Sequence, residues 1–130
     1  MTTTGRKQVL LLDDSALTLD MAKTVLEAAG FGVLTAVDLA ALEGHLARSK
    51  PDLVLLDVQM PEAFGDDVGM VLRAVKGMQV PILLVSSLGD TELAQRAREA
   101  GVDGFISKRA GLDALVERVC AILGQGPRQP

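Results

Sequence analysis

Five polar side chains of this sequence stand where a run of apolar residues ends, and together they could bind a cation and handle a phosphoryl group. They are Asp13, Asp14, Asp57, Ser86 and Lys108. Three carboxylates held close together repel one another and raise one another's pKa unless a cation neutralises them. An all-oxygen site that water can reach suits Mg²⁺, which prefers one or two carboxylates, water and a substrate phosphate. We therefore expect a Mg²⁺ site if the fold brings the three aspartates together.

Asp57 is the candidate nucleophile of this set. A carboxylate can attack a phosphoryl group and form an aspartyl phosphate. Because the transition state is loose, the protein mainly positions groups and neutralises charge. In this hypothesis, Mg²⁺ is held by Asp14, with or without Asp13, and contacts one phosphoryl oxygen. The Lys108 ammonium contacts a second oxygen, and the Ser86 hydroxyl contacts a third.

Each of these residues also has an ordinary structural interpretation. Asp14 or Ser15 could cap a helix, Asp57 could begin a turn, Ser86 could satisfy a strand end, and Lys108 could be solvated. Taken singly, these interpretations are preferred. The combination of all five residues favours a functional site.

The elements that must position these side chains are strands and helices in strict alternation. Three aliphatic runs, at 9–12, 53–56 and 82–85, predict strands buried on both faces, as in a parallel sheet covered by helices. Weaker strands are predicted at 32–36 and 104–107. The alternation predicts right-handed crossovers and a doubly wound α/β sheet, in which ligands bind beyond the carboxyl ends of the strands. All five polar residues should therefore meet at one edge.

Apolar residues at helical spacing predict the intervening helices. Their inward stripes are expected at Leu17, Met21 and Val25; Leu39, Leu42 and Leu46; Val68, Val71, Leu72 and Val75; Leu93, Ala94, Ala97 and Ala100; and Leu112, Leu115, Val116, Val119 and Leu123. The fourth stripe is mainly alanine, so this helix, predicted at 91–100, should pack least strongly and move most easily. The fifth helix should end at Gly124.

Length and composition limit the function classes. The 130 residues suffice for one domain, predicted at 6–123, with a disordered start at 1–5 and a flexible tail at 124–130. The aliphatic runs are too short to span a membrane, and the start lacks a secretory signal, so we expect a cytoplasmic protein. A net charge of −4 and the absence of Trp and Tyr argue against direct nucleic-acid binding. We expect a complete single-domain protein, although the tail GQGPRQP would also serve as the start of a linker.

Two residue types that often bind metals are each present once. Cys120 lies on the apolar side of a predicted helix and is interpreted as a small buried hydrophobe. His45 has no second histidine or nearby cysteine with which to share a metal, and it is interpreted as a helix-surface residue.

Four motifs resemble the receiver domain of bacterial two-component response regulators, in particular single-domain, chemotaxis-receiver-like regulators. They are VLLLDDS at 9–15, LVLLDVQMP at 53–61, PILLVSS at 81–87 and GFISK at 104–108. Their order and spacing match the family from about 6 to 123. The resemblance implies a flavodoxin-like fold with a five-stranded parallel sheet of order 2-1-3-4-5 and five helices.

The resemblance also implies a role for each residue that matches a family motif. Asp57 is the phosphoacceptor, and Asp13, Asp14 and the backbone carbonyl of Gln59 join it as Mg²⁺ ligands. On phosphorylation, the residue at the position of Ser86 shifts toward the phosphoryl group in this family. The aromatic residue at the position of Phe105 then turns inward, and the face of the fourth helix, fifth strand and fifth helix is remodelled for a protein partner.

Two positions match those that govern access of the hydrolysing water in receivers, namely Gln59 and Leu88. A bulky apolar Leu88 is expected to shield the acyl phosphate and lengthen its lifetime. Three features depart from the family pattern: Arg109 stands where a proline usually follows the lysine, Ser87 replaces a smaller residue, and Ala63 and Phe64 replace an apolar–Asp pair. Phe64 is interpreted as a plug of its loop, with a partner contact as the alternative.

The function implied is a phosphoacceptor switch with little enzymatic activity beyond its own phosphotransfer and autodephosphorylation. Its expected partners are a histidine kinase or phosphotransfer protein and a downstream protein target, and it should be a monomer or weak dimer.

A pseudo-receiver that signals without phosphate remains an alternative, kept open by Arg109 and Ser87. A phosphatase of the haloacid dehalogenase type is disfavoured, because that family places its nucleophile in a D-x-D pattern after the first strand. No nucleotide-binding glycine motif is present.

Overall fold

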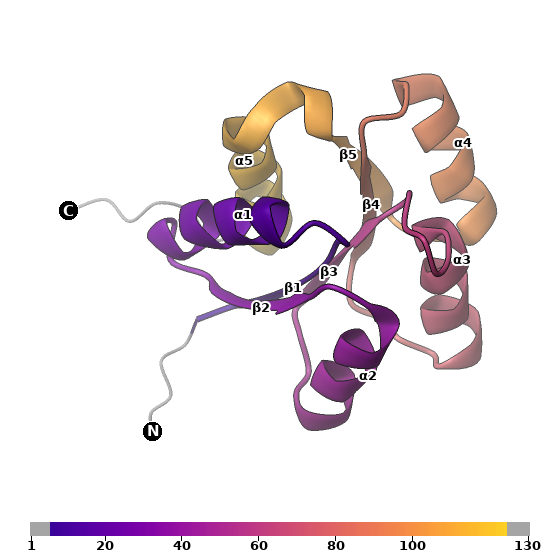
Figure 1. The fold of residues 1–130 in the computed structure, drawn as a ribbon, viewed down its shortest axis with the longest axis horizontal. Helices are drawn as coiled ribbons and strands as arrows, with labels where there is room; N and C mark the ends of the chain where they lie inside the picture. Colours follow the sequence, from indigo (N-terminus) through magenta and orange to yellow (C-terminus); the bar gives the residue numbers. More distant parts are fainter. Residues whose placement is uncertain (1–5, 125–130) are drawn as a thin grey trace.

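The computed structural model describes residues 6–124, and their centre is a five-stranded parallel sheet with helices on both faces (Figure 1). The strands are β1 (Gln8–Leu12), β2 (Gly32–Ala36), β3 (Leu53–Asp57), β4 (Ile82–Ser86) and β5 (Gly104–Ser107). Their order in the sheet is β2-β1-β3-β4-β5. The predicted fold class and strand order are therefore confirmed.

Helices connect successive strands and cover the two faces of the sheet. They are α1 (Ala16–Ala28), α2 (Leu39–Arg48), α3 (Gly65–Met70), the π-helical turn η1 (Val71–Val75), α4 (Asp90–Ala100), the 3₁₀ turn η2 (Lys108–Ala110) and α5 (Gly111–Leu123). Figure 1 shows α1 and α5 on one face and α2, α3 and α4 on the other. Each face carries its own apolar core, here called the α1/α5 core and the α2–α4 core.

The central strands are buried on both faces because both faces are covered. In β1, Leu11 belongs to the α1/α5 core, whereas Leu10 and Leu12 belong to the α2–α4 core. Alternating side chains of one strand thus enter opposite cores, which is why the strand reads as an unbroken aliphatic run. In the parallel register Leu12 pairs with Leu56, so the residues that follow β1 and β3 emerge side by side.

The buried stripe of α1 differs from the prediction. Leu19, Ala22 and Leu26 face the sheet, while Leu17 is 69% exposed and Met21 is 46% exposed. The helix carries two apolar stripes, and both have the spacing of one helical face. Periodicity alone could not decide which stripe meets the sheet.

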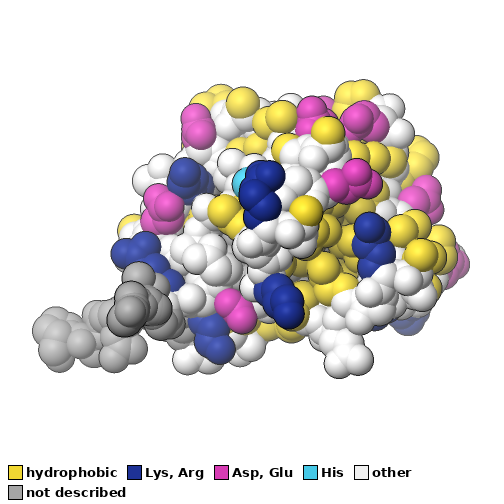
Figure 2. Space-filling view, turned by 90° about the horizontal axis from the view of Figure 1, so that it is seen from below, with side chains coloured by type: hydrophobic (Ala, Val, Ile, Leu, Met, Phe, Trp, Pro, Cys, Tyr) yellow, Lys and Arg dark blue, Asp and Glu magenta, His cyan; other side chains and the backbone are white. Residues whose placement is uncertain are grey.

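The predicted stripe of the third helix is also partly wrong. Leu72 is buried, but Val71 and Val75 are exposed. The reason is the π-helical turn, in which the Lys76 amide donates to the Val71 carbonyl at 3.1 Å, five residues back. This wider turn breaks the 3.6-residue period on which the prediction relied. Figure 2, seen from the side of α2, shows hydrophobic side chains at this surface.

The other helices follow the prediction. In α4 the buried residues are Leu93, Ala97 and Ala100, so its apolar packing is indeed alanine-rich. The α5 helix ends at Gly124, whose φ of 70° is left-handed, as predicted. None of the helices within 6–124 is long and apolar enough to cross a membrane. The predictions for residues 1–5 and 125–130 lie outside the described part of the chain.

The single cysteine and the single histidine both contact the rest of the fold. Cys120 packs against the α1/α5 core, as expected of a small hydrophobe, but it is half-buried rather than fully buried. His45 is half-buried rather than free at the surface, because its Nε2 lies 2.8 Å from the Thr35 carbonyl oxygen. This contact joins α2 to β2.

Candidate functional site

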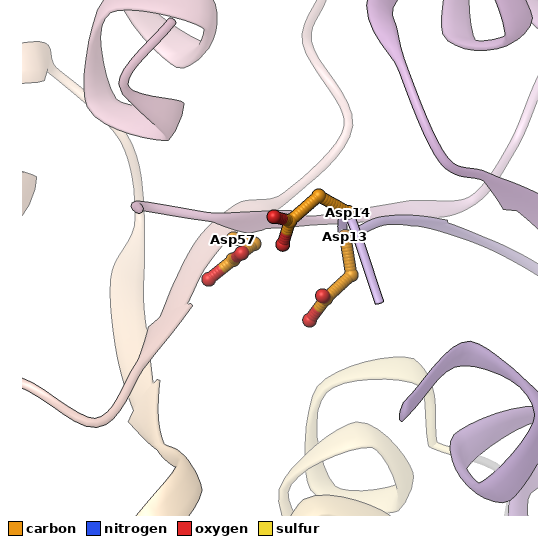
Figure 3. A group of neighbouring side chains, drawn as sticks. All are labelled: Asp13, Asp14 and Asp57. Carbon is orange, nitrogen blue, oxygen red and sulfur yellow. The ribbon is translucent and has the colours of Figure 1, made fainter. Parts of the chain in front are cut away.

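Three aspartates meet at the carboxyl edge of the sheet. Asp13 and Asp14 follow β1, and Asp57 ends β3, with one carboxylate oxygen from each lying within 4.8 Å of the others (Figure 3). The pairing of Leu12 with Leu56 makes this meeting unavoidable, because parallel strands end at the same edge. The sequence prediction for these three residues thus agrees with their placement.

Lys108 lies between two of these carboxylates. Its Nζ is 2.8 Å from Asp13 Oδ2 and 3.3 Å from Asp57 Oδ1. Asp13 and Asp57 are only 6% and 4% exposed, so both carboxylates share one ammonium group in a poorly solvated place. One positive charge does not balance the three negative charges gathered there, and the cluster favours a further cation.

The burial and the neighbouring charges of the cluster mainly affect the pKa of Asp57. The pKa of Asp57 is raised to about 6: burial raises it most, the negative charge of Asp13 adds to that rise, and the charge and hydrogen bond of Lys108 oppose it. A hydrogen bond from the backbone of Gln59 also lowers the pKa of Asp57. Asp57 is therefore largely ionised at neutral pH and becomes protonated under mildly acidic conditions.

Asp13 is fixed by the start of the first helix. Its Oδ1 accepts a hydrogen bond from the Ser15 amide at 2.9 Å, while its other oxygen contacts Lys108. Ser15 in turn caps α1, since its hydroxyl accepts from the Thr18 amide at 3.1 Å. The cap is thus Ser15, which leaves Asp14 exposed at the edge of the cluster.

Ser86 ends β4, the strand next to β3, and is almost completely buried. In the register of the two strands Asp57 pairs with Val85, so Ser86 stands one residue beyond the level of Asp57. The Ser86 hydroxyl accepts a hydrogen bond from the Leu88 amide at 3.1 Å. Leu88 itself is half-buried and packs against the α2–α4 core.

The loop after Lys108 is ordered without the proline of the family pattern. The described peptide bonds are all trans, and the Ser107 hydroxyl accepts from the Arg109 amide at 3.1 Å. This bond caps the short turn η2 and holds Lys108 at the site. Arg109 therefore does not prevent Lys108 from reaching Asp57.

Phe105 lies in β5 beside Leu84 and is half-buried against the α2–α4 core. Its backbone carbonyl accepts from Arg118 Nη1 of α5 at 3.4 Å. Next to it, a shallow pocket of about 440 Å³ runs along α4, β5 and α5. Phe105 thus stands between the core and the face that the resemblance assigns to a partner.

Gly65 begins α3 directly against the end of β3. A Cβ atom at this position would lie 2.1 Å from the backbone oxygen of Asp57, so any side chain would overlap it. The Gly65 amide donates to the Val58 carbonyl at 3.0 Å, and Gln59 pairs with Phe64 in an antiparallel bridge. The loop after Asp57 therefore folds back tightly on itself.

The interpretation of Phe64 as a loop plug is wrong. Phe64 is 52% exposed, and the guanidinium of Arg96 lies over its ring at 5.5 Å from the ring centroid. Arg96 belongs to α4 and was not singled out from the sequence. Its spacing of four residues from Glu92 predicts a pair within one helix, but nothing in the sequence indicates contacts with residues 30 positions earlier.

The donor set fits a hard divalent cation. The three residues that meet offer only carboxylate oxygens, with no histidine or cysteine among the described groups of possible ligands. Mg²⁺ prefers such oxygens together with water and phosphate. The acidic pocket thus has the composition of a Mg²⁺ site.

Comparison with known proteins agrees with this geometry. The family model for the response regulator receiver domain matches residues 9–120. The DNA-binding response regulator MtrA of Mycobacterium tuberculosis is 35% identical over 127 residues, which are 98% of this chain and 55% of MtrA. The polar-differentiation response regulator DivK of Brucella ovis is 30% identical over 121 residues, 91% of this chain and 97% of DivK.

Solved structures share the fold. The Vibrio cholerae chemotaxis protein CheY4 superimposes with a TM-score of 0.82 at 24% identity, covering 91% of this chain and 99% of that one. A response regulator from Thermotoga maritima gives a TM-score of 0.79 at 29% identity, covering 92% and 99%. The chain spans about half the length of the MtrA relatives but nearly all of DivK. With its family model matched over most of its length, the chain belongs to the response regulator receiver domains.

Proposed function

We propose that this receiver domain is a signalling switch that accepts a phosphoryl group on Asp57 from a histidine kinase or a phosphotransfer protein. The observation that carries the proposal is the meeting of Asp57 with Asp13, Asp14 and Lys108 at the carboxyl edge of the sheet. The proposed domain is 6–123.

In the proposed transfer, a carboxylate oxygen of Asp57 forms a bond to phosphorus while the bond from phosphorus to the donor's imidazole nitrogen breaks. The electron pair of the broken bond returns to the imidazole. Lys108, already 3.3 Å from Asp57, neutralises charge on the phosphoryl oxygens. The Ser86 hydroxyl is placed one residue beyond the level of Asp57, where it can donate to another oxygen.

The residues proposed to hold Mg²⁺ are Asp13, Asp14 and Asp57, with the backbone carbonyl of Gln59 as a further ligand. When bound, Mg²⁺ supplies positive charge that offsets both the carboxylates and the phosphoryl oxygens. The chain's own contribution is to fix these oxygens on two neighbouring strand ends before the donor arrives.

The output is proposed to be a change in the face made by α4, β5 and α5. Ser86 turns toward the phosphoryl group, Phe105 fills the space beneath, and a downstream protein reads the altered face. The half-buried position of Phe105 beside the pocket on this face supports the assignment. DNA binding is a property of MtrA, named as a DNA-binding regulator, and is not proposed for this chain.

The test is phosphorylation by acetyl phosphate in the presence of Mg²⁺, followed by intact mass and by amide NMR. The wild type and Asp20→Asn, which alters an exposed aspartate of α1, should both gain one phosphoryl group. Asp57→Asn should gain none, and omission of Mg²⁺ should abolish the gain. If the wild type gains no phosphoryl group and gives no Mg²⁺-dependent response to beryllofluoride, the chain is a pseudo-receiver that acts by docking.

The lifetime of the acyl phosphate is proposed to depend on Leu88. Leu88 lies two residues after Ser86, and its apolar side chain packs against the α2–α4 core. In this position we expect it to limit the access of water to Asp57. Leu88→Glu should therefore lose the phosphoryl group several times faster than the wild type, measured by the decay of the phosphorylated mass. Leu88→Met keeps the size and polarity of the side chain, so it should lose the phosphoryl group at the wild-type rate. Equal rates of loss in the wild type and both variants would contradict the shielding by Leu88.

A further inference from the structure

We propose that Arg96 is a positioning residue that holds α4 against the loop after Asp57, and that this contact restrains the switch. The inference rests on the proposed function, because it concerns how α4 responds to phosphorylation of Asp57. Four side chains make the contact: Phe64, Asp66, Glu92 and Arg96. We call this group the α4 clamp.

The clamp holds the guanidinium of Arg96 on three sides. Arg96 Nη1 lies 3.2 Å and 3.1 Å from the two carboxylate oxygens of Asp66 in α3. Its Nε lies 3.1 Å from Glu92 Oε2, one turn earlier in α4, and the group also covers the ring of Phe64. Glu92 moves with α4, whereas Asp66 and Phe64 lie outside it, so a displacement of α4 strains the contacts of Arg96 with these two residues.

The other end of the clamp is tied to the phosphoacceptor. Phe64 pairs with Gln59, and Gly65, between Phe64 and Asp66, lies directly against the backbone of Asp57. The first turn of α3 therefore cannot shift without moving Asp57. Farther along the same helix, a Cβ atom at Gly69 would lie 3.3 Å from Leu56 Cδ1 of β3, so α3 lies close to the sheet there as well. The clamp thus joins α4 to a rigid support.

The clamp is important for α4 because the apolar packing of this helix is weak. Leu93 is the only large hydrophobic residue among its buried side chains, and the others are Ala97 and Ala100. Alanine buries little apolar area, so few contacts resist a shift of the helix. The polar contacts of Arg96 therefore add to the few apolar contacts that fix the position of α4.

The direction of the effect follows from the proposed switch. A turn of Ser86 toward Asp57 pulls on the loop that leads into α4, since the Ser86 hydroxyl is bonded to the Leu88 amide in that loop. The support at Asp66 stays in place, so the clamp must weaken as α4 moves. The clamp stabilises the arrangement described here relative to the switched one.

An ordinary surface ion pair would have little influence, because exposed pairs contribute little to stability. Arg96 and Asp66 are less exposed than such pairs, with side-chain exposures of 28% and 18%. Arg73 and Asp103 form a second arginine–aspartate pair between elements, with exposures of 24% and 49%, that does not touch the loop after Asp57. This pair provides a matched control.

The experiment measures the apparent Kd for beryllofluoride at saturating Mg²⁺, followed by amide NMR at Asp57 and its neighbours. Arg96→Gln and Asp66→Asn should each lower the apparent Kd about fivefold, the size of a modest coupling between sites. The double variant should bind no more tightly than either single variant, because both remove the same contact. Arg73→Gln should keep the wild-type Kd. An unchanged or weaker affinity in Arg96→Gln overturns the restraint.

A second measurement needs no phosphoryl analogue. Backbone amide exchange across α4 should be faster in Arg96→Gln than in the wild type, whereas exchange in β1 and β3 should be unchanged. Arg96→Lys keeps the charge but not the two-oxygen contact, and it should give intermediate exchange. Equal exchange in α4 would show that Arg96 does not hold the helix. A wild type that ignores beryllofluoride would instead contradict the proposed function, and the exchange data would still decide the role of Arg96.

Discussion

Replacing Asp57 with asparagine is expected to raise the free energy of unfolding at neutral pH by about 2 kcal/mol in the absence of Mg²⁺. Asparagine resembles the protonated, uncharged form of the aspartate. It therefore removes the cost of burying a charge beside Asp13, which is the source of the pKa of about 6 for Asp57. The variant should be more stable than the wild type, although it has lost the proposed reactive group.

The pH dependence gives this prediction its sign. An aspartate with an ordinary value of 3.8 in the unfolded chain and about 6 in the folded one binds more protons when folded between these limits. The wild type consequently loses stability as the pH rises from about 4 to about 6, and the loss is complete above that range. The difference between Asp57→Asn and the wild type should appear across the same window and vanish near pH 4.

Urea unfolding of both proteins at several pH values checks this expectation. Asp20→Asn is the control, because an exposed aspartate should not produce the same pH-dependent gain. Saturating Mg²⁺ should stabilise the wild type and narrow its difference from Asp57→Asn, since binding to the folded state raises its stability. A variant that is less stable than the wild type at neutral pH would show that Lys108 already compensates the buried charge.

Gly65→Ala is expected to lower the free energy of unfolding by about 3 kcal/mol, the upper range for overpacking a well-filled site. The added methyl group would stand 2.1 Å from the backbone oxygen of Asp57, and neither backbone can move freely. The same displacement would disturb the Asp57 carboxylate, so Mg²⁺ binding and phosphorylation by acetyl phosphate should weaken as well.

Gly44→Ala provides a control of opposite sign. Gly44 lies inside α2, and an added Cβ would meet only the flexible end of Arg48 at 3.4 Å. Alanine favours a helix interior over glycine by about 0.5–1 kcal/mol. Gly44→Ala should therefore be slightly more stable than the wild type in thermal and urea unfolding. If Gly65→Ala behaved like Gly44→Ala, the close approach of α3 to β3 would be refuted.

The strands were predictable because their burial leaves a direct mark on the sequence. The aliphatic runs at 9–12, 53–56 and 82–85 lie within β1, β3 and β4, each of which is one residue longer. A strand covered on both faces must be apolar throughout. Few other elements of that length consist only of apolar residues. The site followed from the same fact, since the polar residues after such strands can only meet at one edge.

Helix faces were less predictable, for two separate reasons. In α1, two stripes had the same period, and only packing on the sheet selected Leu19, Ala22 and Leu26 over Leu17 and Met21. Beyond Met70, the π-helical turn changed the period itself. Period analysis assumes a regular α-helix and carries no signal for such a turn.

The contacts around Arg96 could not be predicted because they depend on side-chain reach between two helices. Asp66 and Arg96 are 30 residues apart, and each is an ordinary charged residue of a helix. The loop residue Phe64 was noticed because it departs from the family pattern, yet its neighbour was not. Sequence reasoning places residues on elements, whereas the partner of an exposed side chain depends on the final distance between those elements.

The scattering of the site along the chain has a consequence for synthesis. Asp13, Asp57, Ser86 and Lys108 stand at or directly after the ends of four different strands, and Lys108 lies 51 residues beyond Asp57. Chains are made from the amino terminus, so Asp57 leaves the ribosome well before Lys108 does. A nascent or truncated chain thus carries the acceptor carboxylate without the ammonium beside it. Only a molecule whose central and C-terminal strands have all paired can accept the proposed phosphoryl group on Asp57. Phosphorylation itself thus serves as a check that folding is complete.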